Sequence, residues 1–154
     1  LVLLGLDQLT KYLILLNLEL YEVRLLIPGL FNLVHVTNKG AAFSMFASVD
    51  SPLRHYFFVA VNSAAFLGLT IAAWKMRTHR LLYRVSLAMI GAGAVGNLID
   101  RLRFGAVIDF LDFYAGSYHW PAFNVADSAI CVGVALLFVM NVVEIKQEKN
   151  GSKT

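Results

Sequence analysis

Four aspartates stand out between residues 97 and 128 of a chain that is otherwise strongly apolar: Asp100, Asp109, Asp112 and Asp127. Asp109 ends the apolar run that begins at Val107, and Asp127 opens another apolar run. A carboxylate is costly to bury unless it is paired, hydrogen-bonded or protonated. Acidic residues at the edge of a membrane-like environment therefore usually have a function. We predict that Asp109 and Asp127 form a catalytic pair.

Two neighbouring carboxylates can catalyse hydrolysis of a peptide bond without a metal ion. Because they cannot both ionise easily, one keeps a proton while the other takes a proton from a water molecule. That water attacks the scissile carbonyl, and the protonated acid donates to the carbonyl oxygen. The two residues titrate as a unit, so no fixed role is assigned to either. Spacing alone also allows the alternative that both aspartates cap helices or are solvated loop charges.

The composition is that of a membrane protein. Of the 154 residues, 58% are hydrophobic and 15% are charged, whereas soluble domains average about 45–50% and about 25%. The net charge of +3 is small, and no basic–aromatic cluster suggests a nucleic-acid partner. The four histidines have no metal-ligand spacing, and neither HExxH nor GxSxG occurs, which removes the simplest zinc and serine hydrolase interpretations. We expect no cofactor. Cys131 lies in an apolar run and is expected to be a small buried residue.

Four apolar runs have lengths that suit transmembrane helices. They cover residues 1–16, 56–74, 81–99 and 127–143, and a tail that we expect to be disordered follows at 144–154. The first run covers about 24 Å of the roughly 30 Å hydrocarbon core. Since the chain begins at Leu1, we expect further residues before it. The sequence thus predicts one integral-membrane domain over residues 1–154.

Residues 17–51, between the first and second runs, mix polar and apolar side chains. Pro28 and Gly29 mark a turn, and residues 30–36 alternate and are rich in β-formers, which predicts a strand. Asn38 and Gly40 suit a tight turn. We therefore predict an all-α membrane protein, with four transmembrane helices and a small extracytoplasmic β platform between the first and second.

Basic residues set the orientation, because cytoplasmic loops are rich in Lys and Arg. The second run is followed by Lys75, Arg77, Arg80 and Arg84, and the fourth run by Lys146, Lys149 and Lys153. Both termini are then cytoplasmic, and the two remaining loops lie outside. This topology brings Asp109 and Asp127 to the same outer membrane face.

Two features inside the runs concern helix packing. Asp7 and Lys11 are four positions apart and share a helix face, so we expect an inward ion pair. Its role, structural or in contact with a substrate, stays open. The glycines at 91–96 match GxGxxG, but they lie in a helix-length run with no preceding strand. They indicate close helix packing at Ala92 and Gly96 instead of dinucleotide binding.

The ends of the third and fourth runs nearest the aspartates are also polar. Asn97 and Asp100 are three positions apart and share a helix face, and Arg101 is a candidate partner for a carboxylate. Asn124 or Asp127 suits the N-terminal cap or the first turn of the fourth helix.

Five motifs occur in order along this frame, and together they resemble the bacterial lipoprotein signal peptidase (type II signal peptidase) family. They are Asp7-Gln8-Leu9-Thr10-Lys11, Asn38-Lys39-Gly40-Ala41-Ala42-Phe43, Ala92-Gly93-Ala94-Val95-Gly96-Asn97 followed by Asp100-Arg101, Val107-Ile108-Asp109-Phe110, and Phe123-Asn124-Val125-Ala126-Asp127. Ala92 stands where the family often has Gly, which is a small change.

The resemblance implies an aspartic endopeptidase of the bacterial inner membrane, with Asp109 and Asp127 as its catalytic pair. Its substrate is a diacylglyceryl-modified prolipoprotein, which it cleaves before the lipid-bearing cysteine. Membrane lipids and globomycin-type inhibitors are the other implied partners, and no metal is needed. The supporting and substrate-contacting positions of the family fall on Asp7, Lys11, Asn38, Gly40, Asn97, Asp100, Arg101, Asn124 and Ala126.

Two other classes of function are weighed against the peptidase. A small proton-coupled transporter requires acids within its spans, whereas most acids here lie at one membrane edge and Asp7 is the exception. The other class is an assembly factor without enzymatic activity. Loss of peptidase activity on mutation of either aspartate separates the enzyme from both.

Overall fold

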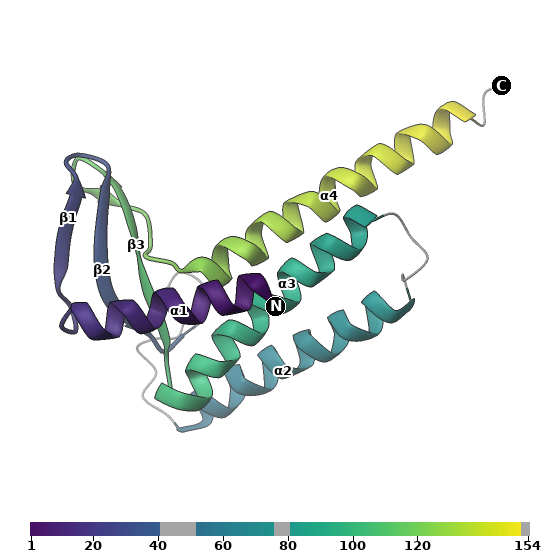
Figure 1. Ribbon diagram of the computed structural model, residues 1–154. Helices are drawn as coiled ribbons and strands as arrows, with labels where there is room; N and C mark the ends of the chain where they lie inside the picture. Colours follow the sequence, from purple (N-terminus) through teal and green to yellow (C-terminus); the bar gives the residue numbers. More distant parts are fainter. Residues whose placement is uncertain (41–51, 76–80, 152–154) are drawn as a thin grey trace.

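The computed structural model describes residues 1–40, 52–75 and 81–151. Within these residues the chain forms four helices, and Figure 1 shows that they gather to one side of a small sheet. The helices are α1 (Val2–Asn17), α2 (Pro52–Lys75), α3 (Leu81–Phe104) and α4 (Val125–Gly151). α3 is central, because it packs against α1, α2 and α4.

The sheet has four antiparallel strands in the order β1-β2-β3-β4. They are β1 (Val23–Ile27), β2 (Phe31–Asn38), β3 (Val107–Ala115) and β4 (Tyr118–His119). The prediction of an all-α protein is therefore wrong in one respect: the described chain is mostly helical, with a sheet built from two distant segments. The hairpin of β1 and β2 agrees with the predicted platform, but β3 and β4 come from the segment that follows α3.

β3 forms because its sequence, VIDFLDFYA, is rich in β-branched and aromatic residues. It pairs with β2, with Val36 opposite Asp109 and Asn38 opposite Val107. The predicted turn at Pro28 and Gly29 lies between β1 and β2, where Gly29 has a φ of 77°. Pairing with β2 fixes the position of Asp109 on a strand instead of in a loop.

The buried core beside the sheet joins α1 to β3. Ile14 and Leu18 pack against Ile108 and Phe110, and all four are at most 5% exposed. Since successive side chains of a strand point to opposite faces, the packing of Ile108 and Phe110 on α1 turns Asp109 to the other face. The core thus orients the aspartate.

Three of the described helices are long and apolar enough to cross a membrane: α2 over His55–Lys75, α3 over Leu81–Phe104 and α4 over Val125–Glu144. α1 has 16 residues and covers only about 24 Å. Three of the four predicted spans are supported, and the first stays a prediction.

Close packing of the helices depends on small residues of α3. A side chain at Gly93 would meet the backbone oxygen of Ala126 in α4, and one at Gly96 would lie 2.5 Å from Asp7 Oδ2 in α1. The predicted close packing at Gly96 is confirmed, the packing at Ala92 stays a prediction, and Gly93 is a second position of close approach. Lack of a side chain at these two positions lets α1 and α4 approach α3.

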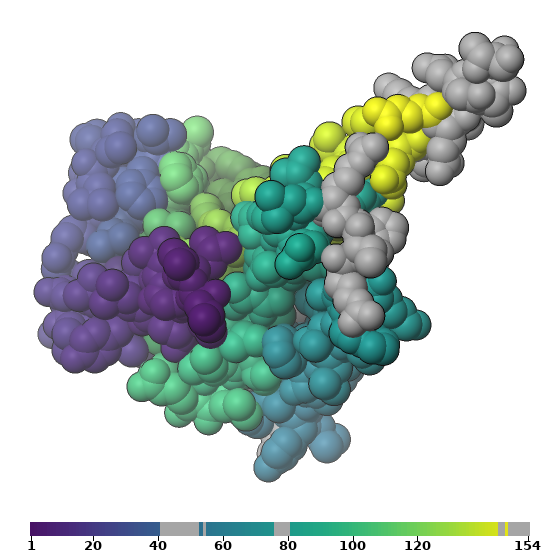
Figure 2. Space-filling model, turned by 45° about the vertical axis from the view of Figure 1, so that its right-hand side comes forward, coloured from purple at the N-terminus to yellow at the C-terminus, as the bar shows by residue number. Residues whose placement is uncertain are grey.

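Two local predictions for α4 are wrong. The helix continues to Gly151, so residues 144–151 are helical and not disordered, and its C-terminal part projects beyond the other helices (Figure 2). Cys131 is exposed on the described chain. The basic residues Arg77 and Arg80, and residues 41–43 of the second motif, lie outside the described residues.

Candidate active site

Asn124 is completely buried and contacts both of the predicted catalytic aspartates. Its side-chain nitrogen Nδ2 donates to Asp109 Oδ1 at 2.7 Å. Its backbone N–H donates to Asp127 Oδ2 at 3.3 Å, and its Oδ1 accepts from the Asp127 N–H at 2.9 Å. Asn124 is thus the residue that ties the end of β3 to the start of α4.

The contacts between Asn124 and Asp127 form a capping box. Asn124 precedes α4, and Asp127 is the third residue of that helix, so each side chain accepts from the backbone N–H of the other. The alternative interpretation, in which the aspartates cap helices, is therefore correct for Asp127 Oδ2, which accepts from the Asn124 N–H. It does not explain Asp109, which lies within a strand.

Asp109 is 3% exposed, and its two oxygens accept from amides. Asn124 Nδ2 binds Oδ1, and Asn38 Nδ2 binds Oδ2 at 3.2 Å. Burial, followed by the charge of Asp127, raises the pKa of Asp109 to about 7, although the two amides and the charge of Lys11 act in the opposite direction. A carboxyl with this pKa can carry a proton at neutral pH and release it during a reaction.

Asp127 is half-buried and is held from the α3 side. Asn97 Nδ2 donates to Asp127 Oδ1 at 2.7 Å. The carbonyl oxygen of the same amide, Asn97 Oδ1, accepts from Lys11 Nζ at 3.1 Å and from Asn124 Nδ2 at 3.3 Å. Two asparagine side chains therefore connect Asp127, Asp109 and the lysine of α1.

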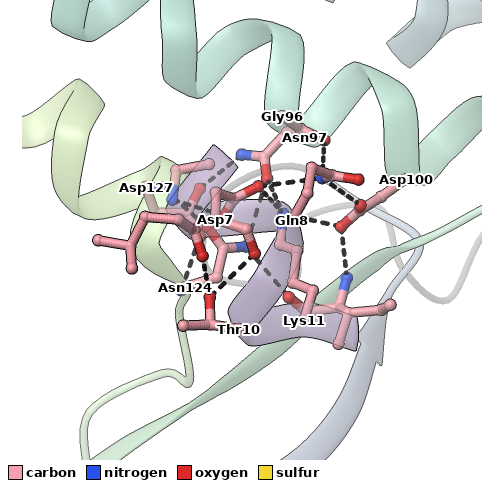
Figure 3. Close-up of polar contacts among 12 residues, drawn as sticks. Asp7, Gln8, Thr10, Lys11, Gly96, Asn97, Asp100, Asn124 and Asp127 are labelled. Atoms are coloured by element: carbon pink, nitrogen blue, oxygen red, sulfur yellow. Dashed lines mark hydrogen bonds and ion pairs between the residues drawn. The ribbon is translucent and has the colours of Figure 1, made fainter. Parts of the chain in front are cut away.

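A second pair of carboxylates surrounds Lys11, and Figure 3 shows them between α1, α3 and the start of α4. Lys11 Nζ lies 3.0 Å from Asp7 Oδ2 and 2.8 Å from Asp100 Oδ2, and all three side chains are at most 2% exposed. The predicted inward ion pair of Asp7 and Lys11 is confirmed. Asp100 makes it a triad that joins two helices.

Arg101 differs from its prediction. Among the described residues it forms no ion pair with a carboxylate, and its Nη2 donates to the backbone oxygen of Gly40 at 2.9 Å. Its guanidinium carbon lies 5.5 Å from the centre of the Phe58 ring. Gly40 in turn donates its N–H to Asn38 Oδ1 at 2.9 Å, which agrees with the predicted tight turn. Arg101 therefore positions the segment that carries Asn38.

All eleven residues predicted for the site lie in one connected set of hydrogen bonds and ion pairs. Ala126 enters it through its backbone, because its N–H donates to Asp7 Oδ1 at 2.9 Å. Thr10 of the first motif donates to its own helix, at Leu6 O and Asp7 O, and has no other hydrogen bond within the described part of the chain.

Gln8 is the member that the sequence analysis missed. Its Nε2 contacts Asp7 Oδ2, Gly96 O and Asp100 Oδ1 at 3.1–3.2 Å. Its only signal in the sequence is its place beside Asp7 in an apolar run.

The site provides acid–base chemistry. Within the described residues, no three His, Cys, Asp or Glu side chains come together in a way that could hold a metal ion. Two carboxylates contact a common asparagine, a further amide donates to the second oxygen of each, and one of them has a pKa near neutrality. This arrangement can activate a water molecule and protonate a leaving group.

Comparison with known proteins gives the same family. The sequence model of the signal peptidase (SPase) II family matches residues 1–143. The lipoprotein signal peptidase of Geobacter metallireducens is 54% identical over 134 residues, which is 87% of this chain and 82% of that protein. The lipoprotein signal peptidase of Desulforapulum autotrophicum is 51% identical over 143 residues, covering 92% and 87%.

Solved structures agree with the sequence comparison. A bacterial membrane enzyme determined by the in meso method at 2.3 Å resolution has a TM-score of 0.80 at 28% identity, over 94% of this chain and 85% of the other. A second one, at 1.9 Å resolution, has a TM-score of 0.76 at 30% identity, covering 90% and 86%. The fold is thus that of a membrane enzyme, and the transporter alternative is not supported. The chain belongs to the signal peptidase II (lipoprotein signal peptidase) family of aspartic peptidases.

Proposed function

We propose that Asp109 and Asp127 are the catalytic pair of a membrane endopeptidase that cleaves diacylglyceryl-modified prolipoproteins before the lipid-bearing cysteine. The observation that carries this proposal is the pair of carboxylates joined by the buried Asn124, with amide donors on both. Family membership supports the substrate class, because the relatives are lipoprotein signal peptidases.

The reaction needs one proton on the pair. The ionised carboxylate takes a proton from a water molecule, whose oxygen forms a bond to the scissile carbonyl carbon. The protonated carboxyl donates its proton to the carbonyl oxygen, which gives a neutral tetrahedral intermediate. The C–N bond then breaks, the carbonyl re-forms, and a proton returns to the departing amine. The signal peptide leaves with a new carboxyl end, and the lipidated cysteine keeps the new amine.

The asparagines hold the pair in position for these steps. Asn38 and Asn124 bind opposite oxygens of Asp109, and Asn97 binds Asp127. Neutral donors fix a carboxylate without the strong preference for its ionised form that a cation would give. The proton can therefore move between the two carboxylates.

The membrane placement is part of the proposal. We take α1 as a fourth span, both termini as cytoplasmic and the catalytic pair as lying at the outer face of the bacterial inner membrane. The basic residues that follow α2 support this orientation. The outer faces of the helices carry large exposed apolar side chains such as Phe57, Leu67 and Phe138. The acyl chains of the substrate can stay among the membrane lipids while its peptide enters the site.

The cleavage assay uses the purified protein in lipid nanodiscs and one prolipoprotein in two forms, with and without the diacylglyceryl group. We expect cleavage of the lipidated form, a product whose first residue is the lipidated cysteine by mass spectrometry, and inhibition by globomycin. Equal cleavage of both forms would contradict the substrate class, and cleavage of neither would contradict the peptidase proposal.

Topology is tested by cysteine labelling in a Cys131→Ala background, because the native cysteine is exposed. Single cysteines at Thr78 and Ser117 should react from opposite sides of the membrane. Reaction of both with an impermeant reagent added outside would exclude the proposed orientation.

A further inference from the structure

Lys11 has a complete set of partners. It is 2% exposed, and its three ammonium N–H groups face three acceptors: Asp7 Oδ2 at 3.0 Å, Asp100 Oδ2 at 2.8 Å and Asn97 Oδ1 at 3.1 Å. An ammonium group has three donors and no acceptor. Lys11 therefore has no donor left for a substrate. Its hydrogen bonds can act on the reaction only through these three partners, and its charge also acts through space on Asp109.

The two carboxylates of the triad hold matched positions next to the catalytic pair. Asp7 Oδ1 accepts from the backbone N–H of Ala126, the residue before Asp127. Asp100 Oδ2 accepts from the backbone N–H of Ile108, the residue before Asp109, at 3.2 Å. One ammonium group thus links, through one carboxylate each, the two backbone segments that carry the catalytic aspartates.

The third partner fixes the direction of an amide. Lys11 donates to Asn97 Oδ1, so the Asn97 nitrogen faces Asp127 and donates to it at 2.7 Å. The reversed orientation would place an NH₂ group against the ammonium and an oxygen against a carboxylate, and both contacts are repulsive. The charge of Lys11 therefore determines that Asp127 receives a donor.

We propose that Lys11 is a positioning residue for the peptidase reaction: through Asp7 and Asp100 it sets the separation of the backbone segments that carry Asp109 and Asp127, and through Asn97 it orients Asp127. The inference rests on the proposed catalytic pair, and it explains why a lysine, and not a larger apolar side chain, lies between α1 and α3.

A structural ion triad and a positioning device predict different results. If the triad only stabilises the fold, activity falls only with the fraction of folded protein. If it positions the pair, the folded enzyme itself is slow, since a misplacement of about 1 Å can lower the rate roughly 100-fold. The charged groups that face Lys11 or the pair are Asp7 of α1, Asp100 and Arg101 of α3, Asp109 of β3 and Asp127 of α4. Removal of the ammonium alone leaves the other charges of this group in place and takes away one cation that acts on Asp109.

The test compares Lys11→Met, which keeps the length of the side chain but removes the charge, with wild type in nanodiscs. Arg24→Met is the matched control, because it removes a cation from the exposed pair with Glu22. We expect Lys11→Met, at a temperature where it is folded by circular dichroism, to lose about 100-fold in kcat with KM within about threefold. The alkaline limb of its kcat/KM profile should move to higher pH, because the charge of Lys11 lowers the pKa of Asp109. Arg24→Met should match wild type in kcat and in pH profile.

Full kcat in folded Lys11→Met, or a loss that follows unfolding with an unchanged pH profile, overturns the proposal. If Lys11→Met does not fold, Asp100→Asn carries the test. This variant keeps the shape of the side chain but weakens its contact with Lys11. We therefore expect kcat to fall at unchanged KM. A kcat equal to that of wild type overturns the proposal. Asp109→Asn and Asp127→Asn are measured in parallel. Turnover by either one means that the catalytic pair itself is wrong, whereas inactivity of both with a fully active Lys11→Met means that only this inference is wrong.

Discussion

Two pairs of carboxylates lie in one hydrogen-bonded network, but their surroundings differ. Asp7 and Asp100 both contact the ammonium of Lys11. Within the described chain, the side chains of Asp109 and Asp127 accept only from amide groups, those of Asn38, Asn97 and Asn124. Burial and the charge of Asp127 raise the pKa of Asp109, so this carboxyl can carry a proton. The ion triad is thus suited to fix structure, and the pair that contains Asp109 to transfer a proton.

The comparison also explains why both pairs are needed. The carboxylates of the ion triad accept from backbone N–H groups beside the catalytic pair. Asp100 accepts from Ile108, and Asp7 accepts from Ala126. The triad can therefore hold the reactive pair without placing a cation on it. A cation in direct contact with Asp109 would lower its pKa and remove the proton that the mechanism requires.

The largest effect on stability is expected from breaking the ion triad. Asp100→Ala leaves Lys11 with one carboxylate and the Ile108 N–H without its acceptor. We expect the free energy of unfolding to fall by about 3–5 kcal/mol, as for other buried pairs that lose one partner, and the fraction that stays folded should also have a lower kcat. Thermal unfolding in detergent measures it.

The matched control for this change is Glu22→Ala, which breaks the exposed pair with Arg24. Surface pairs contribute little, so its melting temperature should equal that of wild type. An Asp100→Ala variant as stable as wild type would contradict the contribution of the ion triad to stability.

A second effect on stability separates the reactive pair from the triad by its dependence on pH. The pKa of Asp109 is raised from 3.8 to about 7, first by burial and then by the charge of Asp127. Protonation of Asp109 therefore stabilises the folded state. Its contribution is complete below about pH 3.8, declines as pH rises, and is absent above about pH 7.

Asp109→Asn cannot titrate at this position, so its melting temperature should rise relative to wild type between these two pH values. The difference in the free energy of unfolding between the variant and wild type should grow by at most about 1.4 kcal/mol per pH unit. Melting curves of both proteins at a series of pH values measure it. Parallel pH profiles for wild type and Asp109→Asn would show that Asp109 keeps an ordinary pKa.

The smallest effect is expected at Asp112, a buried acid outside both pairs. Asp112 accepts from Asn32 Nδ2 at 2.8 Å and contacts His119 Nδ1 at 2.9 Å, but its histidine partner is half exposed. His119→Ala should lower the free energy of unfolding by less than about 1 kcal/mol, because solvent screens exposed pairs, and should leave kcat unchanged. Denaturant titration and the cleavage assay measure both. A large loss of activity would assign Asp112 to the site.

Sequence patterns predict the features that depend on residues close together in the chain. The spacing of Asp7 and Lys11 on one helix predicts their ion pair, and hydropathy predicts the three long spans. The positions of Asp109 and Asp127 at the ends of apolar runs predict the catalytic pair, whereas supporting residues such as Asn38, Gly40 and Ala126 were assigned to the site by motif resemblance. The position of β3 was missed because its partner strand β2 lies about 70 residues earlier, and no local pattern shows such pairing. Gln8 was missed for the same reason, since its contacts on Asp100 and Gly96 depend on tertiary packing.

Helix ends were also predicted poorly, for physical reasons. α3 continues to Phe104, past the predicted end at residue 99, through the charged Arg101 and Arg103. α4 continues to Gly151, through residues 144–149 that are mostly Glu, Lys and Gln. These residues favour helices even where they are too polar for a membrane.

The most direct test of the account is cleavage of a lipid-modified prolipoprotein by purified Asp109→Asn and Asp127→Asn, each shown to be folded, beside the double variant. Asparagine keeps the shape but cannot act as the acid or the base. Each single variant should lose roughly 10²–10⁴-fold in kcat, and the double variant should be little worse than either, because the two residues act as a unit. Near-wild-type turnover by either single variant would contradict the catalytic pair.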